Sequence, residues 1–345
     1  MFENYDTLLV FNDDNRYYFS GFNSSFGCII LTEKKKVFIT DKRYEIEARQ
    51  RAEDFTVICV NGSDLYDIID GQLKLFKSKV VGFEEETTTV SEFNTLKSKL
   101  SDYEFVGASK SIAEKRLIKS ESEIEKIAKA EEITQLALTN VIPDIKVGMS
   151  EKELSDLITY SILRQGAQGL AFDTIVCFGE TAACPHHKPS ADVKLNENDL
   201  ILVDMGALVD GYCGDMTRTF CLGTPDPKLE QIHKTVLDAQ LFALRNLRAG
   251  MTCKEADGLA REYLLAHGYK DEFSHSLGHG IGIAIHEPPC VSSRNDEILR
   301  ENMVVSCEPG IYIEGLGGVR IEDIVVIKND GVVNLTTNFS KEIKL

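Results

Sequence analysis

Short apolar runs alternate with amphipathic stretches over the N-terminal third of the chain. The apolar runs are rich in Val, Ile and Phe and have the length of single strands, and the segments between or after them have helical spacing. The pattern predicts strands at 7–11, 27–31, 36–40, 55–60 and 79–83, and helices at 43–51, 63–76 and 90–100. Such alternation is typical of a small α/β layer domain. A polar, charged stretch at 109–122 is the predicted junction, so we expect an N-terminal α/β domain at 1–115 and a second domain at 116–345.

A longer helix is predicted at the start of the second domain. Ser120 precedes Glu123 by three residues, which is the spacing of a capping box, and apolar residues at helical spacing follow. Pro143 cannot continue the helical hydrogen bonding, so we expect the helix to end at about Val141.

The second domain contains an internal repeat. GMSEKE at 148–153 resembles GMTCKE at 250–255, and each copy places a Ser or Thr three residues before a Glu. This spacing predicts a capping box at the start of a helix in both copies. Gly166 and Gly268 follow the two capping residues at the same distance of sixteen residues, and we expect them to end the two helices.

The repeat continues into a strand and an acid. LNENDLILVDMG at 195–206 matches LRENMVVSCEPG at 299–310: both have an apolar strand, then a carboxylate nine residues after the Leu. The carboxylates are Asp204 and Glu308, and a second acid follows in each half, Asp215 and Glu322. The sequence therefore predicts an α+β domain of two related halves that each present two acids. A solvated turn is the alternative for any one of these acids alone.

Two halves that face each other would bring four carboxylates together. Burial and like charge both oppose ionisation of a carboxyl group. Four negative charges can therefore share a small buried site only if some are protonated or if cations lie among them. Two divalent metal ions would balance four carboxylates.

Histidines are concentrated in a glycine-rich stretch of the second half. His275, His279 and His286 fall within twelve residues, although the whole chain has only seven histidines. Alternating isoleucines at 281–285 predict a strand between them. Because 279 and 286 are an odd number of residues apart, a straight strand would point these two side chains to opposite faces. We expect a bulge or the end of the strand to intervene if both face one site.

A second pair of histidines lies in the first half. His186 and His187 stand in the segment CPHHKP, shortly after a predicted strand at 172–178 that is followed by Gly179. A surface position or a structural hydrogen bond is the alternative role for any single histidine of the chain.

Composition narrows the classes of partner and compartment. The 38 Lys and Arg against 55 Asp and Glu give a net charge of −17, which repels phosphate backbones, so we expect neither nucleic acid nor an anionic membrane as a partner. No run approaches the ~18 apolar residues of a membrane-spanning helix, and the start of the chain lacks the pattern of a signal peptide. Nine cysteines without a Cys-x-x-Cys pair favour free thiols in a reducing cytoplasm.

Together these motifs resemble the proline-peptidase family, the two-metal Xaa-Pro aminopeptidases and Xaa-Pro dipeptidases of the pita-bread fold. The series comprises VDMG from 203, GDMTRT from 214, SLGHGIGIAIHEPP from 276, CEPGIY from 307 and GVRIED from 318. RYYFSG from 16 and FITDKRY from 38 are similar to the N-terminal domain of aminopeptidase P-like members. The resemblance covers nearly the whole chain, and it implies a pita-bread catalytic domain with a pseudo-two-fold repeat after a smaller α/β domain.

The resemblance also implies a set of metal ligands. Asp215 and Glu322 match the residues that bridge two metals in the family. Asp204 matches a ligand of one metal, and His279 and Glu308 match ligands of the other. Four carboxylates and one imidazole form an oxygen-rich set that favours Mn²⁺ and leaves Co²⁺ and Zn²⁺ open.

Further residues match catalytic and supporting positions of the family. His186 matches a histidine on the substrate side, and His286 matches the other histidine of the active site. The family also assigns proton transfer to the residue at the position of Glu308. His275 matches a histidine that flanks the metal ligand, and Arg320 matches an arginine that supports the site beside the last Glu.

One loop departs from the family pattern. Many members have a small residue before a Gly and an Asn two residues after it, whereas this chain has Phe178 before Gly179 and Thr181 after Glu180. The loop precedes His186, so the fine substrate preference does not follow from the resemblance.

The activity that the resemblance implies is hydrolysis of the peptide bond before proline, with proline-containing peptides as substrates and a homodimer as the assembly. Aminopeptidase P-like action on longer peptides and dipeptidase action on Xaa-Pro both stay open, and the N-terminal motifs favour the former. A catalytically inactive peptide- or protein-binding member of the fold is the alternative. A metal-free hydrolase of the creatinase type is disfavoured by the intact acids, and a two-metal phosphoesterase by the acidic composition.

Overall fold

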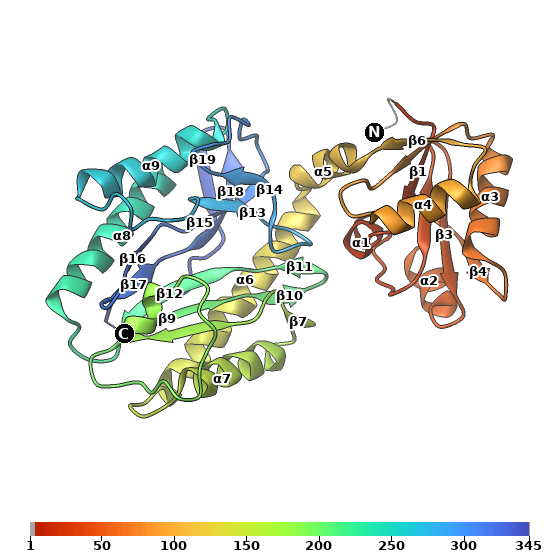
Figure 1. Ribbon diagram of the computed structural model, residues 1–345. Helices are drawn as coiled ribbons and strands as arrows, with labels where there is room; N and C mark the ends of the chain where they lie inside the picture. Colours follow the sequence, from red (N-terminus) through yellow and green to blue (C-terminus); the bar gives the residue numbers. More distant parts are fainter. Residues whose placement is uncertain (1–3, 345) are drawn as a thin grey trace. The chain divides into compact units, whose positions relative to one another are not determined.

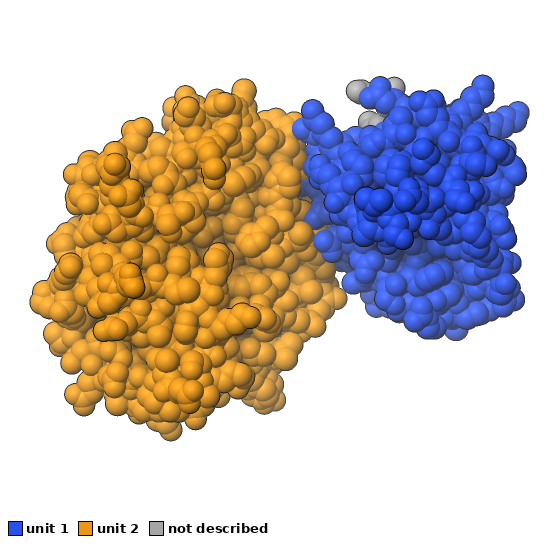
Figure 2. All heavy atoms as spheres, in the orientation of Figure 1, with its two compact units in different colours: residues 1–116 blue, residues 117–345 orange. Residues whose placement is uncertain are grey.

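The computed structural model describes residues 4–344 of the chain. The chain forms two compact units, Met1–Arg116 and Leu117–Leu345 (Figure 2). None of the helices within residues 4–344 combines the length and the apolar character that crossing a bilayer requires.

The first unit is a mixed six-stranded sheet with the strand order β4-β3-β2-β1-β5-β6. Its strands are β1 (Thr7–Val10), β2 (Cys28–Leu31), β3 (Lys36–Asp41), β4 (Thr56–Val60), β5 (Val80–Phe83) and β6 (Glu104–Gly107). Its helices are α1 (Asp13–Ser20), α2 (Glu45–Arg51), α3 (Leu65–Phe76), α4 (Val90–Lys99) and α5 (Ser109–Leu117). The predicted α/β alternation is confirmed, and each predicted strand and helix forms with small shifts at its ends.

Three elements of the first unit were not predicted. Helix α5 occupies the start of the stretch at 109–122 that we expected to be a junction, because its largely polar sequence lacks a clear apolar face. Helix α1 is short and polar, so it lacks an apolar face that could be recognised; the Asn12 side chain caps it by accepting from the Asn15 backbone N–H, and Gly21 ends it with a φ of 67°. Strand β6 lies at the edge of the sheet and is half-exposed, so its residues do not alternate cleanly between apolar and polar.

The second unit consists of two related halves (Figure 1). The first half has helices α6 (Glu121–Val141) and α7 (Glu151–Arg164), with strands β7 (Gly169–Leu170), β8 (Ile175–Phe178), β9 (Leu200–Met205), β10 (Ala207–Val209), β11 (Tyr212–Cys213) and β12 (Met216–Cys221). The second half has helices α8 (Pro227–Asn246) and α9 (Cys253–Ala266), with strands β13 (Gly278–Gly280), β14 (Glu287–Val291), β15 (Val304–Cys307), β16 (Gly310–Ile313), β17 (Gly317–Arg320), β18 (Asp323–Lys328) and β19 (Gly331–Asn334). In each half the helices pack on the strands to form most of one hydrophobic core, and Leu200 and Cys221 of the first half join the core of the second.

The backbone confirms the predicted repeat. Both capping boxes form, and the capping residue of each half pairs in an isolated bridge with the residue before the matched Leu: Ser150 with Lys194, and Thr252 with Ile298. Left-handed φ angles recur at matched positions, with 94° and 92° at Gly166 and Gly268 and 69° and 65° at Asn198 and Asn302. The long helix α6 ends at Val141, as predicted.

The two halves are joined by buried polar contacts between β12 and the start of β18. The Thr217 hydroxyl donates to Glu322 Oε2 at 2.6 Å, and the Glu322 N–H donates to the Thr217 carbonyl at 3.1 Å. Arg218 and Asp323 form an ion pair of 3.0 Å in which both side chains are almost wholly buried. Removing one partner of such a pair leaves an uncompensated buried charge, so these contacts fix the two halves relative to each other.

The strand predicted at 281–285 does not form. Strand β13 ends at Gly280 and β14 begins at Glu287, with a loop of bends between them. The pairing register also shifts between His279 and Gly280, so the expected bulge or strand end between the two histidines is confirmed. The glycines decide this geometry, because a Cβ on Gly280 would lie 2.2 Å from the Pro288 carbonyl oxygen.

The strand predicted at 172–178 is shorter than expected and begins at Ile175.

A buried histidine on α8 generates a test of how this unit responds to pH. His233 Nε2 lies 3.0 Å from the Thr219 carbonyl oxygen, so this nitrogen carries the proton and donates it. Burial lowers the pKa of His233 to about 4. Because an unfolded histidine titrates near 6.5, the unfolded state gains protons first as the pH falls, and stability is lost between about pH 6.5 and pH 4.

We predict that the wild-type protein loses about 2 kcal/mol more stability between pH 7 and pH 5 than the variant His233→Gln, whose amide can donate the same hydrogen bond without titrating. Free energies of unfolding from urea titrations at the two pH values measure this difference. An equal loss in both proteins would show that His233 titrates normally in the folded state.

Candidate metal centre

A cavity of about 740 Å³ lies in the second unit. All of the side chains that the sequence analysis selected as site residues line it: His186, Asp204, Asp215, His275, His279, His286, Glu308, Arg320 and Glu322. The repeat and the motifs therefore converge on one place in the structure, from segments more than one hundred residues apart.

The four acids occupy matched ends of antiparallel strands. Asp204 is the next-to-last residue of β9, and Glu308 directly follows β15. Asp215 directly precedes β12, the partner of β9, and Glu322 directly precedes β18, the partner of β15. An antiparallel pair brings the end of one strand beside the start of the next. Each half therefore delivers its two acids to the same edge, and the seam between the halves brings the edges together.

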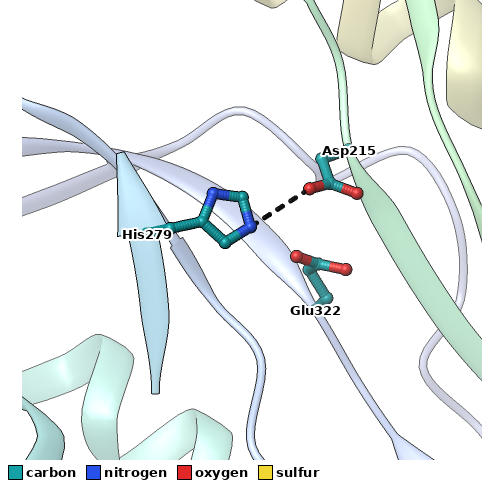
Figure 3. Close-up of side chains that lie close together, drawn as sticks. All are labelled: Asp215, His279 and Glu322. Atoms are coloured by element: carbon teal, nitrogen blue, oxygen red, sulfur yellow. Dashed lines mark ion pairs between the residues drawn. The ribbon is translucent and has the colours of Figure 1, made fainter. Parts of the chain in front are cut away.

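Three of the side chains form a cluster with the spacing of a metal site. Asp215, His279 and Glu322 each place one ligand atom within 4.8 Å of the others (Figure 3). His279 Nε2 lies 3.5 Å from Asp215 Oδ2 and 3.4 Å from Glu308 Oε1. The other ring nitrogen, Nδ1, lies 3.1 Å from the Gly280 carbonyl oxygen and therefore carries the proton. This tautomer leaves the Nε2 lone pair directed at the acids, as a metal ligand requires.

Asp204 supplies a second indication that the site fits a cation. Its Oδ2 accepts a hydrogen bond of 2.7 Å from Arg320 Nη2. Its Oδ1 is buried and has no hydrogen-bond partner among the described residues. A buried polar atom without a partner is costly and uncommon. A cation bound at Oδ1 would satisfy it, so the donor set present in this chain fits a metal centre.

The electrostatics of the acids agree with this geometry. Burial raises the pKa of Asp215 and of Glu322 well above the usual range, and the negative charges of the neighbouring acids raise both further. Burial also raises the pKa of Glu308. Burial lowers the pKa of His279, which keeps the imidazole in the neutral form that binds metals. The protein alone therefore disfavours the ionised form of Asp215, Glu308 and Glu322, and divalent cations would compensate their charge.

Beside the acids, a hydrogen-bonded chain links His275 to Arg320. His275 Nδ1 lies 2.8 Å from the Ser276 carbonyl oxygen and carries the proton, so Nε2 accepts from the Tyr312 hydroxyl at 2.9 Å. The same hydroxyl accepts from Arg320 Nη1 at 2.9 Å. His275 and Arg320 thus support the centre through Tyr312, a residue that the sequence analysis did not select although it ends the CEPGIY motif.

Glu131 is a second residue that the sequence analysis missed. It is wholly buried on α6, and its carboxylate accepts from the Asp215 backbone N–H at 2.5 Å and from the Thr336 hydroxyl at 2.8 Å. Burial raises the pKa of Glu131 to about 8. Glu131 lies four residues after Ile127, on the apolar face of the helix, so an acid in an apolar stripe was the signal available in the sequence.

The two remaining histidines approach the centre from different loops. The His286 ring lies edge-on to the His279 ring, with 4.4 Å between the centroids. Burial lowers the pKa of His286, and the imidazoles of His279 and His186 lower it further. His186 lies in the loop after β8 and is exposed. Apolar side chains complete the lining: Phe172, Ile175, Pro185, Ile285 and Pro288.

Comparison with protein families gives two matches that together span most of the chain. Residues 125–329 match the model of metallopeptidase family M24. Residues 3–118 match the model of the creatinase/prolidase N-terminal domain.

Individual relatives agree with these matches over nearly their full length. An uncharacterised peptidase of Bacillus subtilis is 38% identical over 331 residues, covering 96% of this chain and 93% of the relative. A Xaa-Pro dipeptidase of Pyrococcus furiosus is 37% identical, with 96% and 93% coverage. The crystal structure of an X-Pro aminopeptidase from Thermotoga maritima superposes with a TM-score of 0.94 at 41% identity, covering 99% of this chain and 97% of that one.

Because the acids in the cavity repel one another, we expect the thermal stability of the unit to depend on bound metal ions. Removing divalent ions with a chelator should lower the thermal unfolding midpoint by about 5–10 °C, and adding Mn²⁺ should restore it. In Asp215→Asn the amide relieves repulsion among the acids but carries no charge to the ions. We expect this variant to be at least as stable as the wild type without metal, to gain little from Mn²⁺ and to bind fewer than two ions per chain.

Scanning calorimetry with and without the chelator, together with metal analysis by mass spectrometry, measures these effects. Two tightly bound ions and a normal Mn²⁺ response in Asp215→Asn would remove this residue from the metal centre.

Proposed function

Because the chain belongs to metallopeptidase family M24 and carries the creatinase/prolidase N-terminal domain, we propose that it is a dinuclear metallo-exopeptidase that cleaves the bond before proline. The pita-bread fold of the second unit supports this proposal, as do relatives named Xaa-Pro dipeptidase and X-Pro aminopeptidase. The observation that carries it is that four acids meet at His279, whose unprotonated ring nitrogen faces them. One of these acids, Asp204, has a buried oxygen without a hydrogen-bond partner in the described part of the chain.

Five residues would hold the metal ions: Asp204, Asp215, His279, Glu308 and Glu322. When bound, two divalent ions would polarise the scissile carbonyl as Lewis acids and would lower the pKa of a water molecule, so that hydroxide is available for attack near neutral pH. The oxygen-rich donor set favours Mn²⁺, and Co²⁺ and Zn²⁺ are the alternatives that metal reconstitution would compare.

The proton transfers fall to side chains around these donors. Burial raises the pKa of Glu308, so this carboxyl is suited to take up a proton and return it to the leaving nitrogen. His286 stands beside His279 with its ring accessible from the cavity, where it can donate a hydrogen bond to the charge that develops on the carbonyl oxygen. His186 faces the same cavity from the opposite half and is placed to contact the substrate.

The cavity wall supports a preference for proline. The amide before proline is tertiary and has no N–H, so the enzyme needs no hydrogen-bond acceptor for it. Apolar surface from Phe172, Ile175 and Pro288 lines the same cavity as the acids and offers a slot for the pyrrolidine ring. The substrates would therefore be proline-containing peptides.

The length of the peptide, the compartment and the assembly are finer points of the proposal. The relatives are named both dipeptidase and aminopeptidase, so we propose activity on Xaa-Pro and on Xaa-Pro-Yaa, with the aminopeptidase P-like motifs favouring the longer peptide. Nine free cysteines support a reducing, cytoplasmic location. A homodimer rests on the family resemblance alone, and light scattering in solution measures it.

The proposal predicts Mn²⁺-dependent release of the first residue from Xaa-Pro or Xaa-Pro-Yaa peptides. The matched control is the peptide with alanine in place of proline, which should be a much poorer substrate. Product analysis by mass spectrometry with the metal-loaded protein measures both. No turnover of any of these peptides by protein that holds its metals would instead support an inactive, peptide-binding member of the family.

The variant His286→Ala tests whether His286 binds metal or acts in catalysis without binding metal. Because His286 is outside the five proposed ligands, we expect turnover to fall by about 10²–10³ while metal content stays near the wild-type value. Parallel kinetic and metal measurements on one preparation check this. Loss of metal in proportion to activity would make His286 a ligand and would overturn the five-residue assignment.

A further inference from the structure

Glu151, which lies outside the cavity lining, gathers an unusual number of hydrogen bonds. It is the first residue of α7, and its side chain is wholly buried. Its Oε1 accepts from the Phe178 N–H at 2.9 Å and from the Thr181 hydroxyl. Its Oε2 accepts from His187 Nε2 at 2.7 Å and from the Ser190 N–H at 3.0 Å. One buried carboxylate is thus saturated by four donors from a single segment.

The four donors are distributed along the loop that carries His186. Phe178 and Ser190 stand at the two ends of this loop, so Glu151 ties both ends to the start of α7. His186 lines the cavity, whereas the neighbouring His187 is absent from the lining and points to Glu151. On its other side the loop packs on β17, where a Cβ on Gly318 would lie 2.1 Å from the Ala182 carbonyl oxygen. The loop is therefore held from two sides.

Thr181, where the chain departs from the family pattern, is part of this arrangement. Its hydroxyl donates to Glu151 and also accepts from the Phe178 N–H at 2.9 Å. The hydroxyl therefore links the carboxylate to the first turn of the loop, and the threonine has a defined partner in this chain.

The internal repeat provides a control within the molecule. The residue that matches Glu151 in the second half is Cys253, which is buried in the hydrophobic core and also opens a capped helix. The capping box itself uses Glu153 in one half and Glu255 in the other. Neither the helix start nor the repeat therefore requires a buried carboxylate at position 151. Because burying a charge is costly, its presence in the half that presents His186 indicates a role specific to that loop.

We propose that Glu151 is a positioning residue that fixes the loop at 178–190 and thereby sets the place of His186 in the cavity. The assignment of His186 as a substrate-side residue rests on the proposed function. The effect of Glu151 on catalysis would pass through His186, since the four hydrogen-bond partners of its carboxylate all belong to this loop and none of them lines the cavity.

A double-mutant cycle tests this dependence. In Glu151→Gln the amide group directs its own N–H donors at the donors of the loop, so at least one hydrogen bond is lost. We expect kcat/KM on the best Xaa-Pro peptide to fall by about tenfold to a hundredfold, with metal content unchanged. In the His186→Ala background the same substitution should change kcat/KM by less than about twofold, because the loop no longer carries the side chain that it positions.

Glu153→Gln is the matched control. Glu153 stands two residues away on the same helix turn, is exposed and contacts Ser150 of the capping box. We expect this variant to lower the thermal midpoint slightly and to change kcat/KM by less than about twofold in both backgrounds. Thr181→Val provides a milder second variant if Glu151→Gln does not fold, and it should reproduce the loss in smaller measure and the same dependence on His186.

Amide hydrogen exchange separates this proposal from the proposed function. Glu151→Gln or Thr181→Val should speed exchange in the peptides that cover 178–190, whereas Glu153→Gln should speed it only in the first turn of α7. Unchanged exchange in the loop, or an equal loss of kcat/KM with and without His186, would overturn the positioning role. If the wild type cleaves no Xaa-Pro peptide but the variants still differ from it in exchange as expected, the proposed function is rejected and the positioning of the loop by Glu151 is retained.

Discussion

Mutual repulsion of four buried carboxylates is the constraint around which the second unit is built. Asp204, Asp215, Glu308 and Glu322 face one cavity, and burial raises the pKa of three of them, Asp215, Glu308 and Glu322. A protein can hold such a group only if the surrounding structure prevents the acids from moving apart. The buried ion pair of Arg218 with Asp323 and the hydrogen bonds of Thr217 with Glu322 hold the two halves together at this point. The bonds that join the halves are therefore also the bonds that hold the acids in register.

Around this centre, the site residues are held in place by polar groups that do not themselves line the cavity. Glu131 holds the backbone of Asp215, Tyr312 connects His275 with Arg320, and Glu151 holds the loop of His186. Most of these groups are buried and fully hydrogen-bonded, which makes their geometry rigid. A rigid frame lets the metal centre be complete before substrate arrives, which is what preorganised catalysis requires.

The parts of this arrangement that the sequence predicts are those that depend on local order. Capping boxes, strand lengths and the spacing of the acids are properties of short segments, so the repeat and all four acids could be identified. The prediction of a strand at 281–285 was wrong. Alternating isoleucines are a local feature of the sequence, whereas the close approach of Gly280 to Pro288 arises only in the tertiary structure. Glu151 was equally hidden, because in the sequence it looks like an exposed acid in the first turn of a helix.

The near-symmetry of the two halves has a consequence for the orientation in which a peptide can bind. Their matched acids would treat the two ends of a bound molecule alike, but the histidines break this equivalence, with His275, His279 and His286 on one side and His186 on the other. A peptide reads differently from its amino end and from its carboxyl end. Acids related by the repeat and histidines divided unequally between the halves can therefore bind such a chain in a single orientation, so the divergence of the halves gives the site a direction.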